Sequence, residues 1–260
     1  MFFSALAVFV ASATVSYVMA QKAKKAAQKA ADAMAGVLVN KESNIEPIPV
    51  IYGTRRVGGV RVFVSSRNAA GGDPNEFLYI AMVLAEGEVD AITDIHIDDK
   101  PISDIKYYGL YTINTHTGAD NQAYDSLLSE ANAGWTTAHK LSGVAYLAIK
   151  LKWDSDAFQG VPDITALVRG RKVYDPRSPS AANAYSTNPA LCLRDYMTNA
   201  RFGKGLSASV IDDVAFSAAA TDCDESVTFY TGGGTGKIFE TNAVLQTDET
   251  LFSNIEKMLM

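Results

Sequence analysis

The sequence predicts an α+β fold: a β-rich body between an apolar N-terminal helix and a C-terminal helix–hairpin–helix region. Three observations support this prediction. The chain begins with an uncharged stretch followed by an alanine-rich one, short alternating segments fill residues 45–175, and helix signals return after residue 187. We leave open that the last region continues past residue 260. The chain accordingly divides into three regions: residues 1–40, 41–186 and 187–260.

The composition suits a globular protein and argues against several other classes. Hydrophobic residues make up 48% of the 260 residues and charged ones 20%, which is too apolar for a disordered chain. The net charge is -6, whereas a domain that grips nucleic acid through its phosphates carries a basic surplus. Cys192 and Cys223 form neither a zinc motif nor a disulfide framework. The charge therefore disfavours sequence-independent binding of nucleic acid, and we expect no sequence-specific nucleic-acid binding either.

The N-terminal region is expected to form one helix over about residues 2–35, ending near Gly36. Residues 2–20 carry no charge, and this length is close to the roughly 20 residues that cross a bilayer as a helix. The residues that follow are rich in lysine and in alanine, the best helix former.

Three interpretations of this helix compete. A signal peptide fits the cleavage-like sequence at residues 18–20, but the basic start is missing. A membrane anchor fits the length and the trailing lysines, yet serine, threonine and alanine make the stretch only weakly hydrophobic. We favour a helix packed against copies of itself or a partner helix, because its small residues permit close approach. The side chains expected to contact the membrane or the partner are Phe2, Phe3, Leu6, Phe9, Val10 and Tyr17.

Three segments of the middle region have strand patterns. Val60–Val64 alternates, and Phe77–Ala85 is a continuous apolar run typical of a buried strand. Val144–Trp153 alternates as well. It places Leu147, Ile149, Leu151 and Trp153 on one face and the two lysines between them on the other.

The C-terminal region has helix signals at both ends. Asn188 as N-cap and Pro189 at the first position predict a helix to about residue 200, and a second helix is expected over 209–220. Residues 226–231 and 237–245 predict a hairpin around the glycine run 232–236. Asp248 is expected to cap a last helix, whose apolar face is listed here: Leu251, Ile255, Met258 and Leu259.

No motif for catalysis or phosphate binding is complete. The glycine run before Lys237 lacks the first glycine and the Ser or Thr of a phosphate-binding loop. Residues 205–209 approach a hydrolase nucleophile motif but end in Ser209 instead of Gly. Residues 222–225 lack the later residues of a calcium loop. We predict no enzyme activity, no catalytic residue and no cofactor.

Two polar clusters leave an alternative open. Asp94, His96 and Asp98 share one face of a predicted strand; they could hold a metal ion, but we favour a solvated polar face and predict no metal site. The second cluster comprises Arg55, Arg56, Arg61 and Arg67. It fits either a contact with an acidic partner or a strand edge guarded by charge.

Three segments together resemble the central hub, or tail-tip attachment protein, of long-tailed, lambda-like bacteriophages. The first is residues 48–60, IPVIYGTRRVGGV. The second joins residues 160–164, GVPDI, to 168–177, VRGRKVYDPR. The third comprises residues 188–190, NPA, 193–199, LRDYMTN, and 201–205, RFGKG. The motif residues are Pro49, Tyr52, Gly53, Arg55, Gly58, Gly59, Gly170, Tyr174, Asp175, Pro176, Asn188, Pro189, Gly203 and Gly205.

Local chemistry gives these motifs expected conformations. Tyr52, Gly53 and Thr54 are expected to form a turn, and the Gly58–Gly59 pair a tight reversal before the Val60 strand. Asp175–Pro176 is expected to start another turn.

The resemblance implies a non-enzymatic virion protein at the distal end of a phage tail, built of sandwich- or barrel-like hub domains. It implies a homotrimeric ring that contacts the distal tail protein, the tape-measure protein and other tail-tip proteins. Such a ring takes part in host attachment and genome ejection, and DNA passage through its lumen is left open. Transient contact of residues 2–35 with the host membrane is left open too.

Two rival functions remain at this point. A membrane-anchored bacterial β-rich binding protein would use the apolar N-terminal stretch as its anchor. A carbohydrate-active enzyme would need two carboxylates roughly 5–10 Å apart in a cleft, which a sequence does not display.

Overall fold

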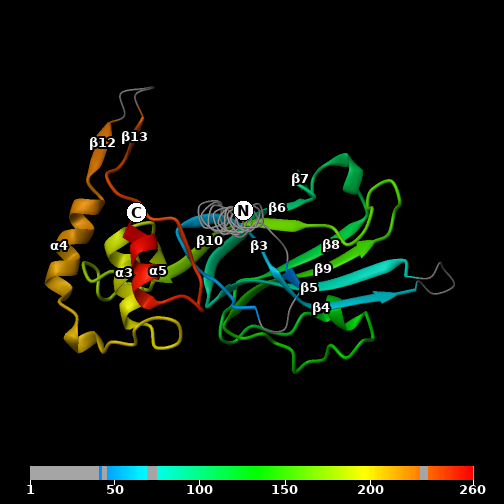
Figure 1. Ribbon diagram of the computed structural model, residues 1–260, viewed down its shortest axis with the longest axis horizontal. Helices are drawn as coiled ribbons and strands as arrows, with labels where there is room; N and C mark the ends of the chain where they lie inside the picture. Colours follow the sequence, from blue (N-terminus) through cyan, green and yellow to red (C-terminus); the bar gives the residue numbers. More distant parts are fainter. Residues whose placement is uncertain (1–40, 43–45, 69–74, 229–233, 260) are drawn as a thin grey trace, which may run out of the picture.

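The computed structural model describes residues 41–42, 46–68, 75–228 and 234–259. The helix expected over residues 2–35 lies outside these ranges, together with its six contact residues. Within them, no helix combines the length and apolar character needed to cross a membrane. The described chain is rich in strands, in accord with the predicted α+β class (Figure 1). Its three longest helices lie at one end: α3 (Pro189–Thr198), α4 (Asp213–Cys223) and α5 (Leu251–Leu259).

Two five-stranded sheets form the body of the molecule (Figure 1). The strands of the first sheet, in spatial order, are β1 (Lys41–Glu42), β4 (Val60–Arg67), β5 (Phe77–Glu86), β9 (Val144–Lys152) and β8 (Tyr111–His116). The second sheet follows the order β11 (Ala184–Tyr185), β10 (Ile164–Val173), β6 (Val89–Ile97) and β7 (Lys100–Pro101), with β3 (Thr54–Gly58) also paired to β10. All these pairs are antiparallel except β1 with β4.

The main hydrophobic core contains residues from both sheets. Ile80 of β5 and Leu147 of β9 come from the first sheet, while Ile97 of β6 and Val168 of β10 come from the second, and all four are fully buried. Burying one such side chain stabilises the fold by roughly 1.5–3 kcal/mol. The two sheets are therefore held together by their facing apolar side chains, and among these Ile80 and Leu147 lie in strands that the sequence predicted.

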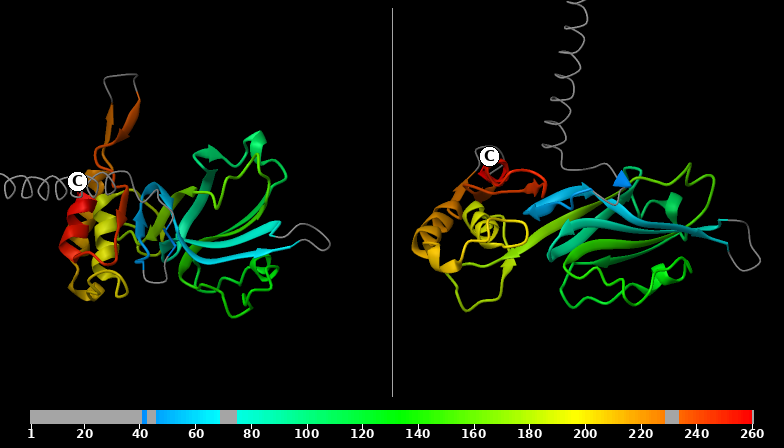
Figure 2. Two further views of the ribbon diagram at one scale, coloured as in Figure 1. Left: turned by 45° about the vertical axis from the view of Figure 1, so that its right-hand side comes forward. Right: turned by 60° about the horizontal axis from the view of Figure 1, so that its bottom comes forward.

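The outer face of the first sheet is buried as well. The segment 117–143, which contains α2 (Ser126–Ser129), runs across this face (Figure 2). Its Leu128 and Trp135 pack against Tyr79 and Tyr146 in a second core cluster. The prediction that Phe77–Ala85 is a buried strand is confirmed, because β5 has apolar neighbours on both faces.

The strand predicted over Val144–Trp153 is confirmed, but its two faces differ from the expectation. The face opposite Leu147 is not solvated along its length, since Tyr146 and Ala148 are buried beneath the covering segment. Trp153 lies beyond the end of β9 and is 48% exposed. The sequence pattern could not reveal a covering segment that lies next to the strand only in three dimensions.

A buried carboxylate with three hydrogen-bond partners fastens this covering segment to the sheet. Asp125, the N-cap of α2, accepts a hydrogen bond from the Leu127 amide, and its other oxygen lies 2.6 Å from Nε2 of His116 on β8. Asn114 donates to that same oxygen at 3.0 Å. Burial raises the pKa of Asp125, but the hydrogen bonds from these partners outweigh burial and leave it below its ordinary value of 3.8.

We expect acid to release the covering segment. Because the pKa of Asp125 is lowered in the folded state, its stabilising contribution is present above pH 3.8 and is lost as the pH falls through the lower folded-state pKa. Fluorescence of Trp135, measured with Trp153→Phe so that one tryptophan remains, should change in this range. Asp125→Asn should remove the transition; an unchanged acid profile in that variant would contradict the assignment.

Helices pack at the end of the body where β10 leaves the sheets (Figure 1). The elements of this region are α3 (Pro189–Thr198), η2 (Ala208–Val210), α4 (Asp213–Cys223), β12 (Ser226–Thr228), β13 (Thr235–Lys237), β14 (Ala243–Leu245) and α5 (Leu251–Leu259). Asn188 caps α3 as predicted. The second helix starts later than predicted, at Asp213, because Asp212 caps it, and Ser209 lies in η2.

The C-terminal strands differ from a single hairpin. β12 pairs with β13, but residues 243–245 form β14, which pairs with β2 (Val50–Tyr52) of the first motif segment. The sequence predicted neither this partner nor its distance along the chain. The pairing of β14 with β2 joins the C-terminal region directly to the start of the β-rich body.

The last helix was only partly predicted. Thr250, and not Asp248, immediately precedes α5, and its hydroxyl accepts the amide of Ser253 at 3.2 Å. Met258 is buried as expected, but Leu259 is 60% exposed. The helix presents a narrower apolar face to its neighbours than its composition suggested.

The glycines of the first motif have separate roles. Gly53 has a left-handed φ of 70° between β2 and β3, which confirms the predicted turn. The predicted reversal at Gly58–Gly59 is wrong: neither glycine has a positive φ, and the chain passes from β3 in the second sheet to β4 in the first. A Cβ on Gly59 would lie 2.4 Å from Cγ of Met82, so close packing explains this glycine.

Candidate functional site

The three motif segments meet in a cluster of buried polar side chains, which we call the polar junction: Tyr52, Arg171 and Asp195. The hydroxyl of Tyr52 donates to Oδ2 of Asp195 at 2.5 Å, and Nε of Arg171 donates to the same oxygen at 2.9 Å. Tyr52 is fully buried, and the side chains of Arg171 and Asp195 are 14% and 13% exposed. One residue from each segment thus shares one carboxylate.

Different elements carry the three side chains. Tyr52 ends β2, Arg171 lies on the part of β10 that extends toward the helices, and Asp195 lies in the middle of α3. The helix is oriented by Asn188, whose side-chain oxygen accepts the amide of Ala190 and whose Nδ2 donates to the carbonyl of Ala220 on α4. The polar junction therefore joins the β-rich body to the helices.

The electrostatics of the polar junction keep the ion pair charged and the tyrosine protonated. Burial raises the pKa of Tyr52 well above its usual value, and the charge of Asp195 raises it further. Burial lowers the pKa of Arg171, but the Asp195 carboxylate outweighs this effect, so that the pKa is raised overall. A fixed charge pair with a tyrosine that cannot release its proton suits structural fastening better than proton transfer.

Gly170 lets two backbones meet beside the polar junction. Its amide donates to the carbonyl of Gly53 at 2.7 Å, and a Cβ at this position would lie 2.1 Å from the carbonyl oxygen of Ile51. Side chains larger than hydrogen do not fit at such a distance. The glycine in the second motif is therefore required by the first motif, which lies against it.

A second ion pair links the same two parts of the molecule. Arg201, which follows α3, binds Glu86 at the end of β5 through two contacts, at 2.6 and 3.1 Å. Burial raises the pKa of Glu86, although the nearby Arg201 opposes this shift. The amide of Glu86 itself donates to the carbonyl of Pro49 at 2.8 Å, so the first motif is held here as well.

Further contacts bind the C-terminal strand region to β3. Oδ1 of Asn242 accepts the amide of Thr54 at 2.7 Å, and Nε of Arg55 donates to the carbonyl of Asn242. The hydroxyl groups of Thr54 and Tyr185 lie 2.6 Å apart. Together with the β2–β14 pairing, these contacts make residues 50–55 the strip on which the C-terminal region rests.

The remaining motif residues have local roles outside the polar junction. The ring of Tyr174 lies 4.5 Å from the guanidinium of Arg194. Asp175 and Pro176 begin the predicted turn, in which the Ser178 amide donates to the Asp175 carbonyl at 3.0 Å. Pro189 occupies the first turn of α3. The two glycines after α3 end the helix: a Cβ on Gly203 would lie 1.8 Å from the carbonyl oxygen of Tyr196, and Gly205 has a φ of 68°.

The two polar clusters of the sequence make contacts within the chain. Asp94 binds Arg56 and contacts His96 at 3.1 Å, whereas Asp98 accepts the amide of Asp163 at 3.0 Å. In the described part of the chain, no three His, Cys, Asp or Glu residues are grouped to hold a metal ion. Each of the four arginines donates to an acceptor in this chain, and the acceptor of Arg61 is the Pro162 carbonyl.

Sequence reasoning identified the three segments but missed their polar centre. Arg171 and Asp195 belong to the quoted segments, yet neither was singled out, because a charged residue in a strand or helix usually faces solvent. Glu86 and Asn242 lie outside the segments. Arg171 and Asp195 are each one of several charged residues in their segments, so nothing in the sequence marks them as a pair before the segments meet.

Comparison with known proteins gives one curated relative. No family model matches the sequence. The chain is 23% identical over 287 aligned positions to the baseplate hub protein pb3 of Escherichia phage T5. The match covers 82% of this chain and 30% of the relative, so this chain spans less than a third of the relative's length.

A comparison with solved structures gives a match of lower sequence identity. It comes from the virion of a native gene transfer agent particle, with 17% identity and a TM-score of 0.47, over 85% of this chain and 48% of that one. This likeness is too distant to carry an argument. The match to the T5 protein supports a relationship to phage tail hubs in general, rather than to lambda-like ones specifically, and a location in the tail of the virion.

Proposed function

We propose that this protein is a non-enzymatic structural component of a phage tail tip, where its β-rich body forms part of the central hub that closes the tail tube. The similarity to a baseplate hub protein over 82% of the chain carries the proposal. The polar junction supports it, because its charged groups are engaged in joining parts of the chain. We retain the lambda-like family as the detailed assignment, on the strength of the three segments.

The hub is proposed to be a homotrimer that contacts the distal tail protein and the tape-measure protein and takes part in attachment and genome ejection. An acidic chain, with a net charge of -6, suits a conduit that should not retain DNA. The proposed division into residues 1–40, 41–186 and 187–260 treats the second and third regions as parts of one hub body. The β2–β14 pairing across them supports that view.

The N-terminal region is proposed to act at the tail axis. Residues 2–35 would pack with their trimer mates or with the tape-measure protein and, upon ejection, contact the host membrane through Phe2, Phe3, Leu6, Phe9, Val10 and Tyr17. The uncharged 19-residue stretch at positions 2–20 motivates this role. Three copies held together would bind a membrane more strongly than one.

The copy number and position of the protein test the main proposal. Light scattering on the purified full chain should give a trimer, and antibody labelling of virions should mark the distal tip of the tail. A monomer in solution and absence from virions would overturn the proposal. Recovery of the protein in bacterial membranes without any phage would instead favour a membrane-anchored binding protein.

Deleting residues 2–35 tests the axial role separately. Tails that carry the deletion should assemble and adsorb normally but eject their DNA poorly, because the axial contact is missing. Single-particle ejection assays with purified receptor or whole host cells measure this step. Normal DNA delivery by these tails would contradict the role.

A further inference from the structure

In the part of the chain that the structure describes, the first sheet ends at β8, whose outer edge pairs with no further strand. The Lys152 amide donates to the carbonyl of Leu110, and the register of β8 with β9 continues from there without a shift. Alternate residues of β8 consequently direct their backbone groups away from β9: Tyr111, Ile113 and Thr115. Among the described residues, none forms a hydrogen bond with these outward groups. The next outward group along this edge, the carbonyl of Thr117, already has a partner, because it accepts the amide of Val89.

The strands β4 and β7, at two other edges, have features that discourage pairing with a further strand, and β8 lacks these features. β4, at the far side of the same sheet, has arginines at positions 61 and 67, a register shift after Arg61, and β1 alongside its first two residues. In the second sheet, β7 is only two residues long and ends in Pro101. β8 contains no lysine, arginine, proline or bulge, and half of it is threonine and isoleucine, which favour strands.

Two apolar side chains of β8 are only partly covered by the rest of the protein. Tyr111 and Ile113 point toward the main core and pack against it, but both are only partly buried. An additional strand along β8 would cover them. The free edge therefore offers apolar burial as well as backbone hydrogen bonds.

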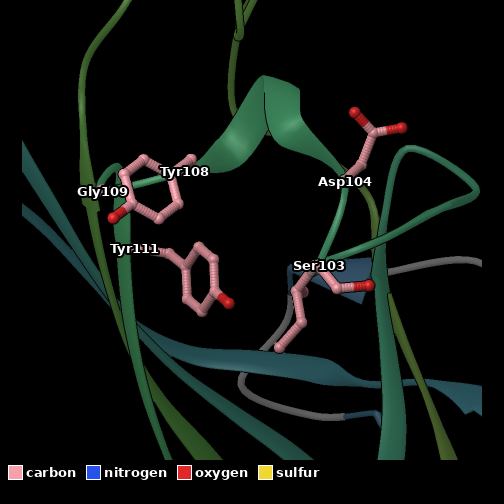
Figure 3. A pocket seen from close by; sticks show the side chains of 6 residues that line it. Ser103, Asp104, Tyr108, Gly109 and Tyr111 are labelled. Carbon is pink, nitrogen blue, oxygen red and sulfur yellow. The ribbon is translucent and has the colours of Figure 1, made fainter.

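A pocket of about 280 Å³ lies at the beginning of the same edge (Figure 3). Tyr108, Gly109 and Tyr111 line one side, and the turn from Ile102 to Asp104 lines the other. Tyr108 is 83% exposed, so its ring is accessible to a peptide that enters the pocket. The pocket and the free edge share Tyr111, so one extended peptide could occupy both.

We propose that β8 accepts an extended segment of a different polypeptide, which adds a sixth strand to the first sheet and places a large apolar or aromatic side chain in the pocket beside Tyr108. Free backbone donors and acceptors at alternate positions select an extended peptide, and the pocket selects one side chain. The choice of a neighbouring virion protein as the donor rests on the proposed function.

A second copy of β8 fits this site poorly. In antiparallel pairing of two such edges, the pocket at Tyr111 would face residues near His116 of the other copy. His116 is already bound to Asp125, and Thr117 and Gly118 after it have no large apolar side chain. Self-pairing would leave the pocket empty, which is why we assign the added strand to another protein.

Hydrogen exchange and crosslinking test the site in the intact chain. In the free protein the amides of Ile113 and Thr115 should exchange rapidly, and in purified virions at least about tenfold more slowly. A photoreactive residue in place of Thr115 should crosslink in virions to one segment of another virion protein. Equal exchange rates in both states, or crosslinks to a second copy of this chain, would overturn the proposal.

Two pairs of variants separate binding from folding. Thr115→Pro removes only an outward amide and should lower incorporation into virions at least about tenfold, whereas Thr115→Val should not. Tyr108→Ala should weaken incorporation, and Ile105→Ala should not, because Ile105 is equally exposed at 84% but does not line the pocket. If Thr115→Pro does not fold, the Tyr108 and Ile105 pair decides; equal incorporation of these two would contradict the proposal.

These outcomes are distinct from those that test the proposed function. Absence of the wild-type chain from virions would refute its role as a tail protein. Presence of the chain in virions with an unprotected β8 edge would refute the strand addition alone. Different observations would therefore refute the proposed role in the tail and the proposed addition of a strand to β8.

Discussion

Gly170→Ala should destabilise the protein by more than about 3 kcal/mol, because the new methyl group would lie 2.1 Å from the backbone carbonyl oxygen of Ile51. A flexible side chain could move aside, but this neighbour is the backbone of β2, which is itself paired with β14. Relief would require separating β10 from β2 and breaking the hydrogen bond from Gly170 to Gly53. We expect a large fall in the urea midpoint, or failure to fold.

Gly160→Ala is the matched control. Gly160 is also a glycine of the second motif, but nothing lies within 4 Å of a Cβ placed there, and its φ is not positive. The unfolding free energy of the Gly160→Ala variant should stay within about 0.5 kcal/mol of the wild-type value. Similar midpoints for the two variants would show that the β2–β10 contact can relax, contrary to the role given to Gly170.

Asp195→Ala should cost about 3–5 kcal/mol, since it leaves the buried guanidinium of Arg171 without its counter-ion and the Tyr52 hydroxyl without its acceptor. Tyr52→Phe removes only one neutral donor and should cost about 1 kcal/mol. Denaturant unfolding of both variants gives these differences, provided that the dependence on denaturant concentration is unchanged.

The neighbouring ion pair on the same strand provides the control. Lys172 binds Glu88 at 3.1 Å, but their side chains are 36% and 47% exposed. Glu88→Ala should therefore change the unfolding free energy by less than about 1 kcal/mol. If Asp195→Ala were no more harmful than Glu88→Ala, the polar junction would not be what fastens the helices to the sheets.

Local features were predicted where local chemistry is sufficient. Asn188 with Pro189 predicted the start of α3, because a cap acts within one turn of helix. The apolar run from Phe77 predicted a buried strand, and Gly53 the bend between two strands. The three segments that resemble phage tail hubs were recognised from the sequence alone. The similarity to a T5 baseplate hub protein supports a relationship to phage tail hubs in general.

Predictions failed where distant residues decide the outcome. Residues 243–245 were assigned to a local hairpin, but they pair with β2, about 190 positions earlier in the chain. The Gly58–Gly59 pair was assigned to a reversal, whereas contact with Met82 explains Gly59. A polar residue or a glycine is compatible with several local structures. Which one forms depends on the residues that pack against it in the folded chain.

By itself, the sequence determined three of the long strand segments, the cap that starts α3, the turn at Gly53, and an acidic, apolar composition that disfavours a phosphate-binding protein. These follow from interactions within a few residues and from bulk charge. Only the tertiary structure decided that Tyr52, Arg171 and Asp195 share one carboxylate, that the covering segment buries the outer face of the first sheet, and that β8 keeps a free edge. Each depends on which segments fold against one another, and that choice is made by burial and backbone pairing summed over the whole chain.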